Sequence, residues 1–228
     1  MTREQVRKHL ELERLMGLDF LPGSKGKAPA KPAAPETKVR EEVPWLGEWR
    51  EFREKVLECT KCRLCEKRTQ VVFGVGSLTA PLLFIGEGPG EKEDQQGEPF
   101  VGRSGQLLTK TLRKLGVKRT QVYIANIVKC RPPGNRTPQH DEVLACMPYL
   151  QRQIRYIKPK IICTLGGPAT QAMLNSKRGI TSMRGRYHIF NNMKIFPTFH
   201  PAYILRNMNN MGILEADLSK VCRDSGLI

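Results

Sequence analysis

The chain has 228 residues, 39% of them hydrophobic and 26% charged, and this composition supports one full-sized hydrophobic core with an appendage. The formal net charge is +16, and 28 of the 38 basic but only 14 of the 22 acidic side chains fall in residues 51–228. The folded part therefore carries the charge, which excludes a basic tail as its source and favours a nucleic acid over an anionic lipid surface as partner. No apolar stretch approaches the roughly 20 residues that span a bilayer and no secretory signal is recognisable, so we expect a cytoplasmic protein.

The first 44 residues are expected to stand apart from the core. Residues 1–20 place apolar side chains at roughly helical spacing, which predicts a short amphipathic helix or, equally, a frayed and solvated one. Residues 21–44 are rich in Pro, Ala, Gly and Lys and cannot bury much surface, so they indicate a flexible linker. Residues 45–228 are then left as the principal domain.

Three cysteines crowd into residues 59–65, which read Cys-Thr-Lys-Cys-Arg-Leu-Cys and follow a helical pattern of apolar residues that begins at Trp45. Two more, Cys130 and Cys146, come far downstream. Thiolates are soft metal ligands, and a CxxC step lets two sulfurs reach one metal from a single turn, so the set predicts an iron-sulfur or a zinc site. Disulfide bonds are the weaker explanation, because nothing in the sequence indicates secretion.

Four short apolar runs downstream of these cysteines are typical of buried strands. They lie at residues 82–85, 122–125, 161–165 and 195–196. Helical patterns separate most of them, at residues 105–115, 141–156 and 168–174. This alternation predicts an α/β fold, namely a three-layer αβα sandwich around a central, mainly parallel sheet of four strands.

Polar residues at the ends of these strands are the candidates for a site, because ligands of such sheets bind beyond the carboxyl ends of the strands. The turn Gly-Glu-Gly-Pro-Gly at residues 86–90 carries an acid where a nucleotide-binding turn would not, so Glu87 is a candidate catalytic carboxylate, or else a solvated loop acid. Asn126 follows the second strand and either reads a ligand or ties down a turn. His200 follows the last strand, at the same end of the sheet.

Taken together, these motifs resemble the iron-sulfur family of uracil-DNA glycosylases, often called family four, over about residues 55–222. The resemblance rests on the turn at residues 86–90, Pro-Phe-Val-Gly at 99–102, Asn126 leading to Lys-Cys-Arg-Pro-Pro at 129–133, Asn-Arg-Thr-Pro at 135–138 and His-Pro-Ala-Tyr at 200–203. It implies the fold of that superfamily and an enzyme that flips uracil out of single- or double-stranded DNA. Hydrolysis of the N-glycosidic bond would leave an abasic site for base excision repair, without strand cleavage.

The resemblance also implies roles for single residues. Glu87 would position water and stabilise the positive charge on the sugar, and His200 would donate a hydrogen bond to a uracil carbonyl oxygen. Phe100 would stack on the flipped base, with a plain core role as its alternative, and the Asn126 amide would pair with the uracil edge. The turn residues Gly86 and Gly88 are assigned to the substrate pocket. Contacts with DNA are expected from Arg184, Tyr203, Leu205 and Arg206.

For the cofactor, the resemblance implies a structural 4Fe-4S cluster. The family pattern is an early CxxC pair, then a cysteine before Arg-Pro-Pro, then one on the following helix; it matches Cys59, Cys62, Cys130 and Cys146. A Cys62 and Cys65 pair has the same local geometry, so the first two ligands stay open, and zinc stays the rival metal.

Alternatives to a monofunctional glycosylase are a relative that binds DNA without catalysis, a relative that traps uracil DNA covalently through a histidine such as His188, and an electron carrier. The intact Glu87, Asn126 and His200 favour the enzyme. We expect a monomer, with a repair or replication protein as a candidate partner of the N-terminal extension.

Overall fold

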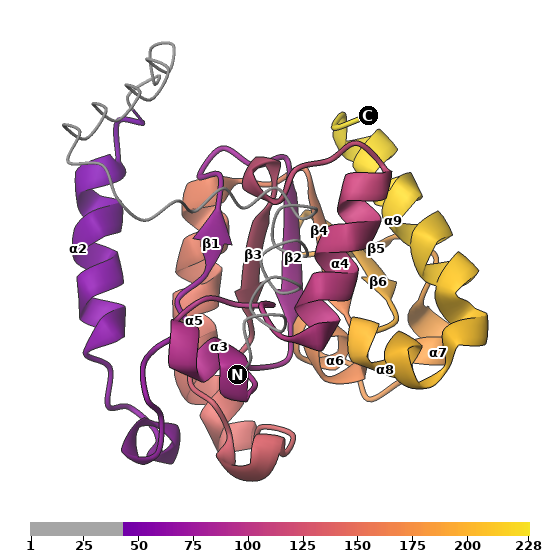
Figure 1. Cartoon of the computed structure of the whole chain (residues 1–228). Coiled ribbons are helices and arrows are strands. Elements are labelled where there is room, and N and C mark those ends of the chain that lie inside the picture. The colour runs from indigo at the N-terminus through magenta and orange to yellow at the C-terminus, as the bar shows by residue number, and fades with distance from the viewer. Residues whose placement is uncertain (1–42) are drawn as a thin grey trace, which may run out of the picture. The chain divides into compact units, whose positions relative to one another are not determined.

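The computed structural model describes residues 43–228, so the predicted N-terminal helix and most of the predicted linker lie outside the described residues. The α-helices are α2 (Leu46–Leu57), α3 (Glu91–Gln96), α4 (Arg103–Lys114), α5 (His140–Ile157), α6 (Gly167–Leu174), α7 (Ile180–Met183), α8 (Pro201–Arg206) and α9 (Met211–Ser225) (Figure 1). The strands are β1 (Val75–Gly76), β2 (Leu82–Gly86), β3 (Tyr123–Asn126), β4 (Ile161–Leu165), β5 (His188–Phe190) and β6 (Met193–Thr198). No helix in this part of the chain is long and apolar enough to cross a membrane.

The strands form one six-stranded sheet in the order β1-β3-β2-β4-β6-β5. The four inner strands are parallel, and the short edge strands β1 and β5 pair antiparallel to their neighbours. A mainly parallel sheet with the four predicted strands is thus confirmed, but the count of four is wrong. The two edge strands have only two and three residues and are partly exposed, so they carry no apolar run that periodicity could detect.

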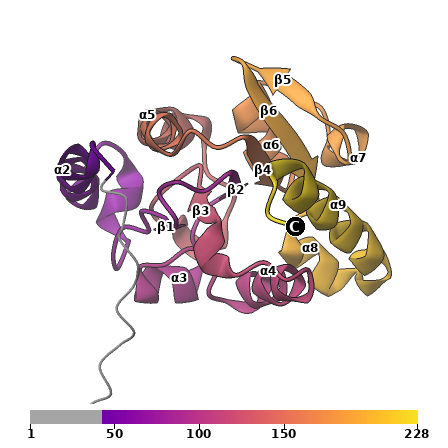
Figure 2. The same cartoon turned by 90° about the horizontal axis from the view of Figure 1, so that it is seen from above.

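Helices cover both faces of the sheet, which confirms the three-layer sandwich. Side chains alternate along each strand, so Leu83 and Ile85 of β2 pack with α2, α5 and α6, whereas Leu82 and Phe84 pack with α4, α8 and α9. Figure 2 shows α5 on one side of the sheet and α4 with α9 on the other. The predicted helices at residues 105–115, 141–156 and 168–174 are confirmed as α4, α5 and α6, with ends within two residues.

The chain order places a crevice at the carboxyl end of β2. The chain passes from β2 to β3 on one side and then crosses to β4 on the other, which makes the end of β2 a topological switch point. Glu87 directly follows β2, Asn126 ends β3, and His200 comes two residues after β6. The three candidate polar residues therefore meet at one edge of the sheet.

Candidate active site

A cleft with a volume of about 580 Å³ opens at this edge. Among the residues that line it are Glu87, Gly88, Glu93, Phe100, Ser104, Arg136, Thr137, His200, Tyr203 and Arg206. They come from loops after β2, β3 and β6, so segments more than 100 residues apart in sequence share one wall. The fold thus brings the two predicted catalytic residues and the predicted stacking ring into the same space.

Asn126 is not among the residues that line this cleft, but it lies beside Gly86, as does the lining residue Phe100, and it is 1% exposed. The amide oxygen Oδ1 is buried and accepts no hydrogen bond from the residues that the structure describes. Buried polar atoms without partners are rare in proteins because each costs roughly 1 to 3 kcal/mol. An acceptor left in this state marks a place where a ligand can supply a donor.

Gly86 is the reason that the amide and the Phe100 ring can share this space. In the sheet Gly86 pairs with Asn126, and a Cβ at this position would lie 2.5 Å from Asn126 Oδ1 and 2.6 Å from the Phe100 ring. Any larger residue would therefore collide with both groups. The glycine therefore lets the Asn126 amide and the Phe100 ring pack closely against the end of β2.

Phe100 has a left-handed backbone conformation, with a φ of 55°, which is uncommon for a residue with a bulky side chain. Two charged groups hold this segment. Oε1 of the buried Glu93 accepts hydrogen bonds from the backbone N–H of Val101 at 2.9 Å and of Gly102 at 2.8 Å. The Arg119 guanidinium donates to the carbonyl of Phe100 at 3.1 Å and to that of Pro99. Strained backbone maintained by such contacts often serves a functional site.

The same contacts set the orientation of the Phe100 ring. Its centroid lies 5.6 Å from that of His200, with 32° between the ring planes. Phe100 is 6% exposed, so both its predicted stacking role and the alternative core role fit its burial.

His200 is held in one tautomer by its own backbone turn. The N–H of Ala202 donates to Nδ1 of His200 at 3.0 Å, so in the neutral ring the proton sits on Nε2. Burial, with a contribution from the positive Arg206, lowers the pKa of His200 to about 4. The ring is therefore neutral at physiological pH and offers one N–H donor.

Glu87 lines the cleft and is partly buried. Burial raises the pKa of its carboxyl group above the ordinary value, and a hydrogen bond from the side chain of Thr137 opposes this shift. Thr137 stabilises the charged carboxylate. A carboxylate in a shielded site is suited to stabilise positive charge or to orient a water molecule.

The predicted DNA contacts divide into two groups. Tyr203 and Arg206 line the cleft, whereas Leu205 is partly exposed on α8 next to the buried Ile204. Arg184 instead forms a bidentate ion pair with the buried Asp217, at 2.7 and 2.8 Å, and covers the Phe199 ring at 5.1 Å. We interpret Arg184 as a structural residue, because its charge is already neutralised inside the protein.

His188, the candidate for covalent trapping, lies on the edge strand β5. Its Nε2 is 2.9 Å from the carbonyl oxygen of Met183. It is not among the residues that line the cleft with Glu87.

The five clustered cysteines meet in a second, much smaller pocket, with a volume of about 10 Å³. The residues that line it include Cys59, Cys62, Cys65, Arg68, Lys129, Cys130, Cys146 and Tyr149. All seven cysteines of the chain are free. Among residues 43–228, no three His, Cys, Asp or Glu side chains come close enough to hold a single metal ion.

Donors surround the sulfur atoms of this pocket. The Tyr149 hydroxyl donates to Cys59 Sγ at 3.2 Å, Arg68 to Cys130 Sγ at 3.3 Å, and the Lys129 backbone N–H to Cys146 Sγ at 3.3 Å. Burial raises the pKa of the Cys146 thiol to about 11, so a bound cationic centre would be needed to keep it as a thiolate at neutral pH. The chemistry of this donor set fits an iron-sulfur cluster.

Lys129 joins the cysteine pocket to the backbone of Asn126. Its side chain is 1% exposed, and its ammonium group donates to the backbone carbonyl of Asn126 at 2.9 Å and to Gln153 at 2.6 Å. The two pockets are therefore neighbours within one polar network.

Sequence reasoning missed the residues that hold the others in place, namely Glu93, Arg119, Arg136, Thr137 and Glu142. Glu93 is one of several acids that follow the glycine-rich turn, and Arg136 with Thr137 belongs to a motif, but no local pattern reveals their partners. Each contacts residues whose proximity depends on the tertiary fold.

The sequence was then compared with known proteins. Residues 73–223 match the uracil DNA glycosylase superfamily. A type-4 uracil-DNA glycosylase of Sulfurisphaera tokodaii is 47% identical over 180 residues, which cover 75% of this chain and 81% of that protein. A type-4 uracil-DNA glycosylase of Thermotoga maritima is 49% identical over 159 residues, which cover 69% of this chain and 83% of that protein. A type-5 uracil-DNA glycosylase of Pyrobaculum aerophilum is only 26% identical, over 78% of this chain and 92% of that protein. The resemblance seen in the motifs is confirmed, and the chain belongs to the type-4 uracil-DNA glycosylase family.

Proposed function

We propose that this protein is a monofunctional uracil-DNA glycosylase, which flips uracil out of DNA and hydrolyses its N-glycosidic bond. The products are free uracil and an abasic site, the substrate for the next step of base excision repair. The single observation that carries the proposal is the buried, unpaired Oδ1 of Asn126 beside the Phe100 ring. Uracil is planar and its N3–H is a donor, so it can supply the hydrogen bond that Asn126 Oδ1 lacks and present a flat face to the Phe100 ring.

The Asn126 amide explains selection of uracil over cytosine. Its Oδ1 accepts the uracil N3–H while its NH₂ group donates to the neighbouring carbonyl O4. Cytosine has the opposite arrangement, an acceptor at N3 and an amino group at C4, so both contacts would become repulsive. Phe100 stacks on the face of the base, and Gly86 lets the ring and the Asn126 amide lie close together.

His200 stabilises the departing base. As the glycosidic bond breaks, negative charge builds up on the uracil, and the Nε2–H of neutral His200 donates to its carbonyl oxygen O2. A neutral imidazole can donate this hydrogen bond without giving up its proton, and the pKa of about 4 keeps the His200 ring neutral at physiological pH.

Glu87 acts on the sugar side. Its carboxylate stabilises the positive charge that develops on the deoxyribose and orients the attacking water, as carboxylates do in glycoside hydrolysis. No lysine lines the cleft among the described residues, which agrees with hydrolysis rather than strand cleavage. Tyr203 and Arg206 at the rim contact the DNA, and Leu205 on the same helix fills space left by the flipped base.

A 4Fe-4S cluster held by Cys59, Cys62, Cys130 and Cys146 supplies structural cross-linking of the segments before β1 and after β3. The choice of Cys59 is supported by its hydrogen bond from Tyr149. The pKa of Cys130 is raised by burial, lowered by Arg68, and raised again by the nearby Cys62 and Cys59, which places Cys59 close to Cys130. The test replaces Cys59 or Cys65 by serine. Cys59→Ser should lose the visible absorbance of the cluster and Cys65→Ser should retain it; the reverse result would assign the pair to Cys62 and Cys65.

The activity is tested with a labelled oligonucleotide that carries one uracil, analysed on a denaturing gel with and without alkali. Alkali-dependent cleavage by the wild type, lost in Asn126→Ala and in His200→Ala while cluster absorbance and nonspecific DNA binding persist, supports the proposal. Full activity in both variants would contradict the site assignment. An intact oligonucleotide with the wild type would favour a DNA-binding relative without catalysis. Monomeric state, cytoplasmic location and a repair or replication partner stay predictions.

A further inference from the structure

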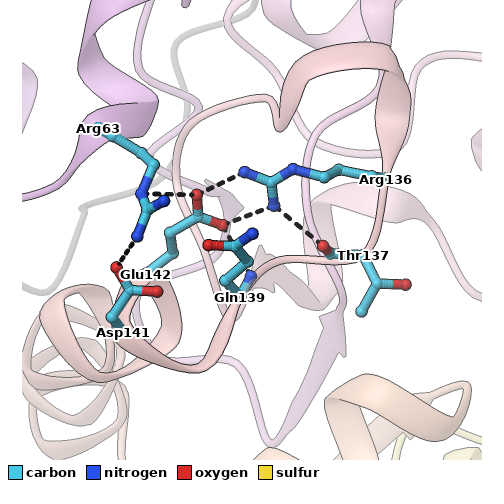
Figure 3. A network of polar contacts seen from close by, with 6 residues as sticks. All are labelled: Arg63, Arg136, Thr137, Gln139, Asp141 and Glu142. Atoms are coloured by element: carbon cyan, nitrogen blue, oxygen red, sulfur yellow. Dashed lines mark hydrogen bonds and ion pairs between the residues drawn. The ribbon is translucent and has the colours of Figure 1, made fainter.

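A buried carboxylate lies between the cysteine pocket and the cleft. Glu142 sits in the first turn of α5, and its side chain has an exposed fraction of 0%. Its two oxygens accept hydrogen bonds from the Arg136 guanidinium at 2.6 and 2.8 Å, a bidentate geometry, and Oε2 also accepts from the backbone N–H of Gln139 at 2.7 Å (Figure 3). Charge-assisted bidentate pairs of this kind are strong and directional.

The same carboxylate faces the cysteine segment. Arg63 lies between Cys62 and Cys65 in sequence, and its Nε atom is 3.7 Å from Glu142 Oε1. The guanidinium of Arg63 also contacts the exposed Asp141. Figure 3 shows the two arginines approaching the Glu142 carboxylate from opposite sides.

On the other side, the network ends at the catalytic carboxylate. Arg136 donates to the backbone carbonyl of Thr137 at 3.0 Å, and both residues line the cleft. The Thr137 side chain bonds to Glu87 and lowers its pKa against the effect of burial. Contacts therefore run from the cysteine segment through Arg63, Glu142 and Arg136 to the loop at residues 135–138, which lines the same cleft as Glu87.

We propose that Glu142 is a positioning residue, which fixes the loop at residues 135–138 relative to the cysteine segment so that Thr137 meets Glu87. This inference rests on the proposed glycosylase function. The cysteine segment alone cannot orient that loop, since Arg63 and Arg136 are both cations and repel each other unless an anion lies between them. The cluster thereby influences the catalytic wall through Glu142 without taking part in the reaction.

Glu142→Gln tests this, with Asp141→Asn as the matched control. The two residues are adjacent, both contact Arg63, and each substitution removes one negative charge from the same helical turn. Arg136→Lys serves as a second variant, because it retains the charge but loses the bidentate geometry. Three quantities are measured with the cluster-containing protein: kcat and KM on the uracil oligonucleotide, the pH dependence of kcat/KM, and the rate at which a chelator bleaches the cluster.

We expect Glu142→Gln to lower kcat about tenfold with little change in KM, since a small misplacement of a reacting group has such effects. The acidic limb of the pH profile should move to higher pH, because Glu87 loses part of its bond from Thr137, and bleaching should accelerate. Arg136→Lys should change the kinetic quantities in the same direction, whereas Asp141→Asn should resemble the wild type.

A Glu142→Gln protein that melts at lower temperature but keeps the kcat and pH profile of the wild type would overturn the inference and leave Glu142 with a structural role. Equal kinetic losses in Glu142→Gln and Asp141→Asn would also overturn it, because surface charge would then explain both. An inactive wild type would instead refute the proposed function, and the bleaching rates would still report whether Glu142 supports the cysteine segment.

Discussion

The two walls of the cleft are held in different ways. The wall that presents Phe100 is fixed through its backbone, since Glu93 binds two N–H groups and Arg119 two carbonyl groups around one strained residue. The wall at residues 135–138 is fixed through side chains, by the bidentate pair of Arg136 with Glu142. The residues that hold the first wall are Glu93 in α3 and Arg119 shortly before β3. The second wall is connected to the cysteine segment, because Glu142 also pairs with Arg63.

This difference indicates that the two walls serve different steps: the Phe100 wall serves base recognition, and the wall at residues 135–138 serves catalysis by Glu87. Recognition of a flat base requires the Phe100 ring to keep its position relative to the Asn126 amide. The contacts of Glu93 and Arg119 with the backbone around Phe100 maintain that position and involve no residue of the cysteine pocket. Tuning of Glu87 depends on a hydroxyl group whose loop is tied to the cysteine segment. Damage to the cysteine pocket should therefore reach the loop at residues 135–138 and, through Lys129, the Asn126 backbone before it reaches the backbone clamp on Phe100.

The largest effect is expected when a side chain is added at Gly86, next to Asn126 and Phe100. Gly86→Ala adds a Cβ at 2.5 Å from Asn126 Oδ1 and 2.6 Å from the Phe100 ring, so one of them has to move. We expect kcat/KM on the uracil oligonucleotide to fall by about 100-fold or more. Gly212→Ala is the control, because no atom lies within 4 Å of its added Cβ. Unchanged activity in Gly86→Ala would show that the base binds elsewhere.

The clamp on Phe100 is tested next, with Glu93→Ala and Glu93→Gln. Alanine leaves two N–H groups without acceptors, which should lower the free energy of unfolding by about 2 to 4 kcal/mol and reduce kcat/KM roughly tenfold. Glutamine keeps an oxygen where both bonds are accepted, so it should retain most of the stability and activity. Equal losses in both variants would mean that the charge of Glu93, rather than its hydrogen bonds, holds the segment.

The pH profile tests the wall at residues 135–138. Glu87 acts as a carboxylate with a raised pKa, so kcat/KM should fall about tenfold per pH unit as the pH drops below that pKa. Thr137→Ala removes a bond that favours the charged form and should move this limb to higher pH, whereas Thr137→Ser should leave it in place. His200 is neutral above its pKa of about 4, so it should add no limb near neutral pH. A near-neutral limb that vanishes in His200→Gln would contradict the neutral donor.

The smallest effects concern the two arginines predicted to bind DNA. Arg206 is exposed at the cleft, so Arg206→Gln should reduce the slope of log affinity against log salt by roughly 0.7 to 0.9. Arg184→Gln should leave this slope unchanged and lower the melting temperature, because it strands the buried Asp217. A reduced slope in Arg184→Gln would mean that the ion pair opens to DNA.

Local sequence features were sufficient for much of the fold and part of the site. The inner strands are apolar runs buried on both faces, so each can be predicted from its own residues. Once the strands are located, Glu87, Asn126 and His200 can be placed at their ends. The edge strands could not be predicted, since β1 and β5 are short, partly exposed and stabilised by a neighbour. The ion pair of Arg184 could not be predicted for a related reason: a basic run indicates charge, but the partner Asp217 lies 33 residues downstream.

The sequence by itself determined which residues meet at the carboxyl edge of the sheet, because the strands and the helices between them can be recognised from local patterns of apolar side chains and such an alternation forms a parallel sheet. The tertiary structure alone decided how those residues are held and charged. The strained Phe100, the neutral His200 and the carboxylate of Glu142 between two arginines depend on distances between segments far apart in the chain. Burial and hydrogen bonding, which set pKa and orientation, come from those distances rather than from any residue type.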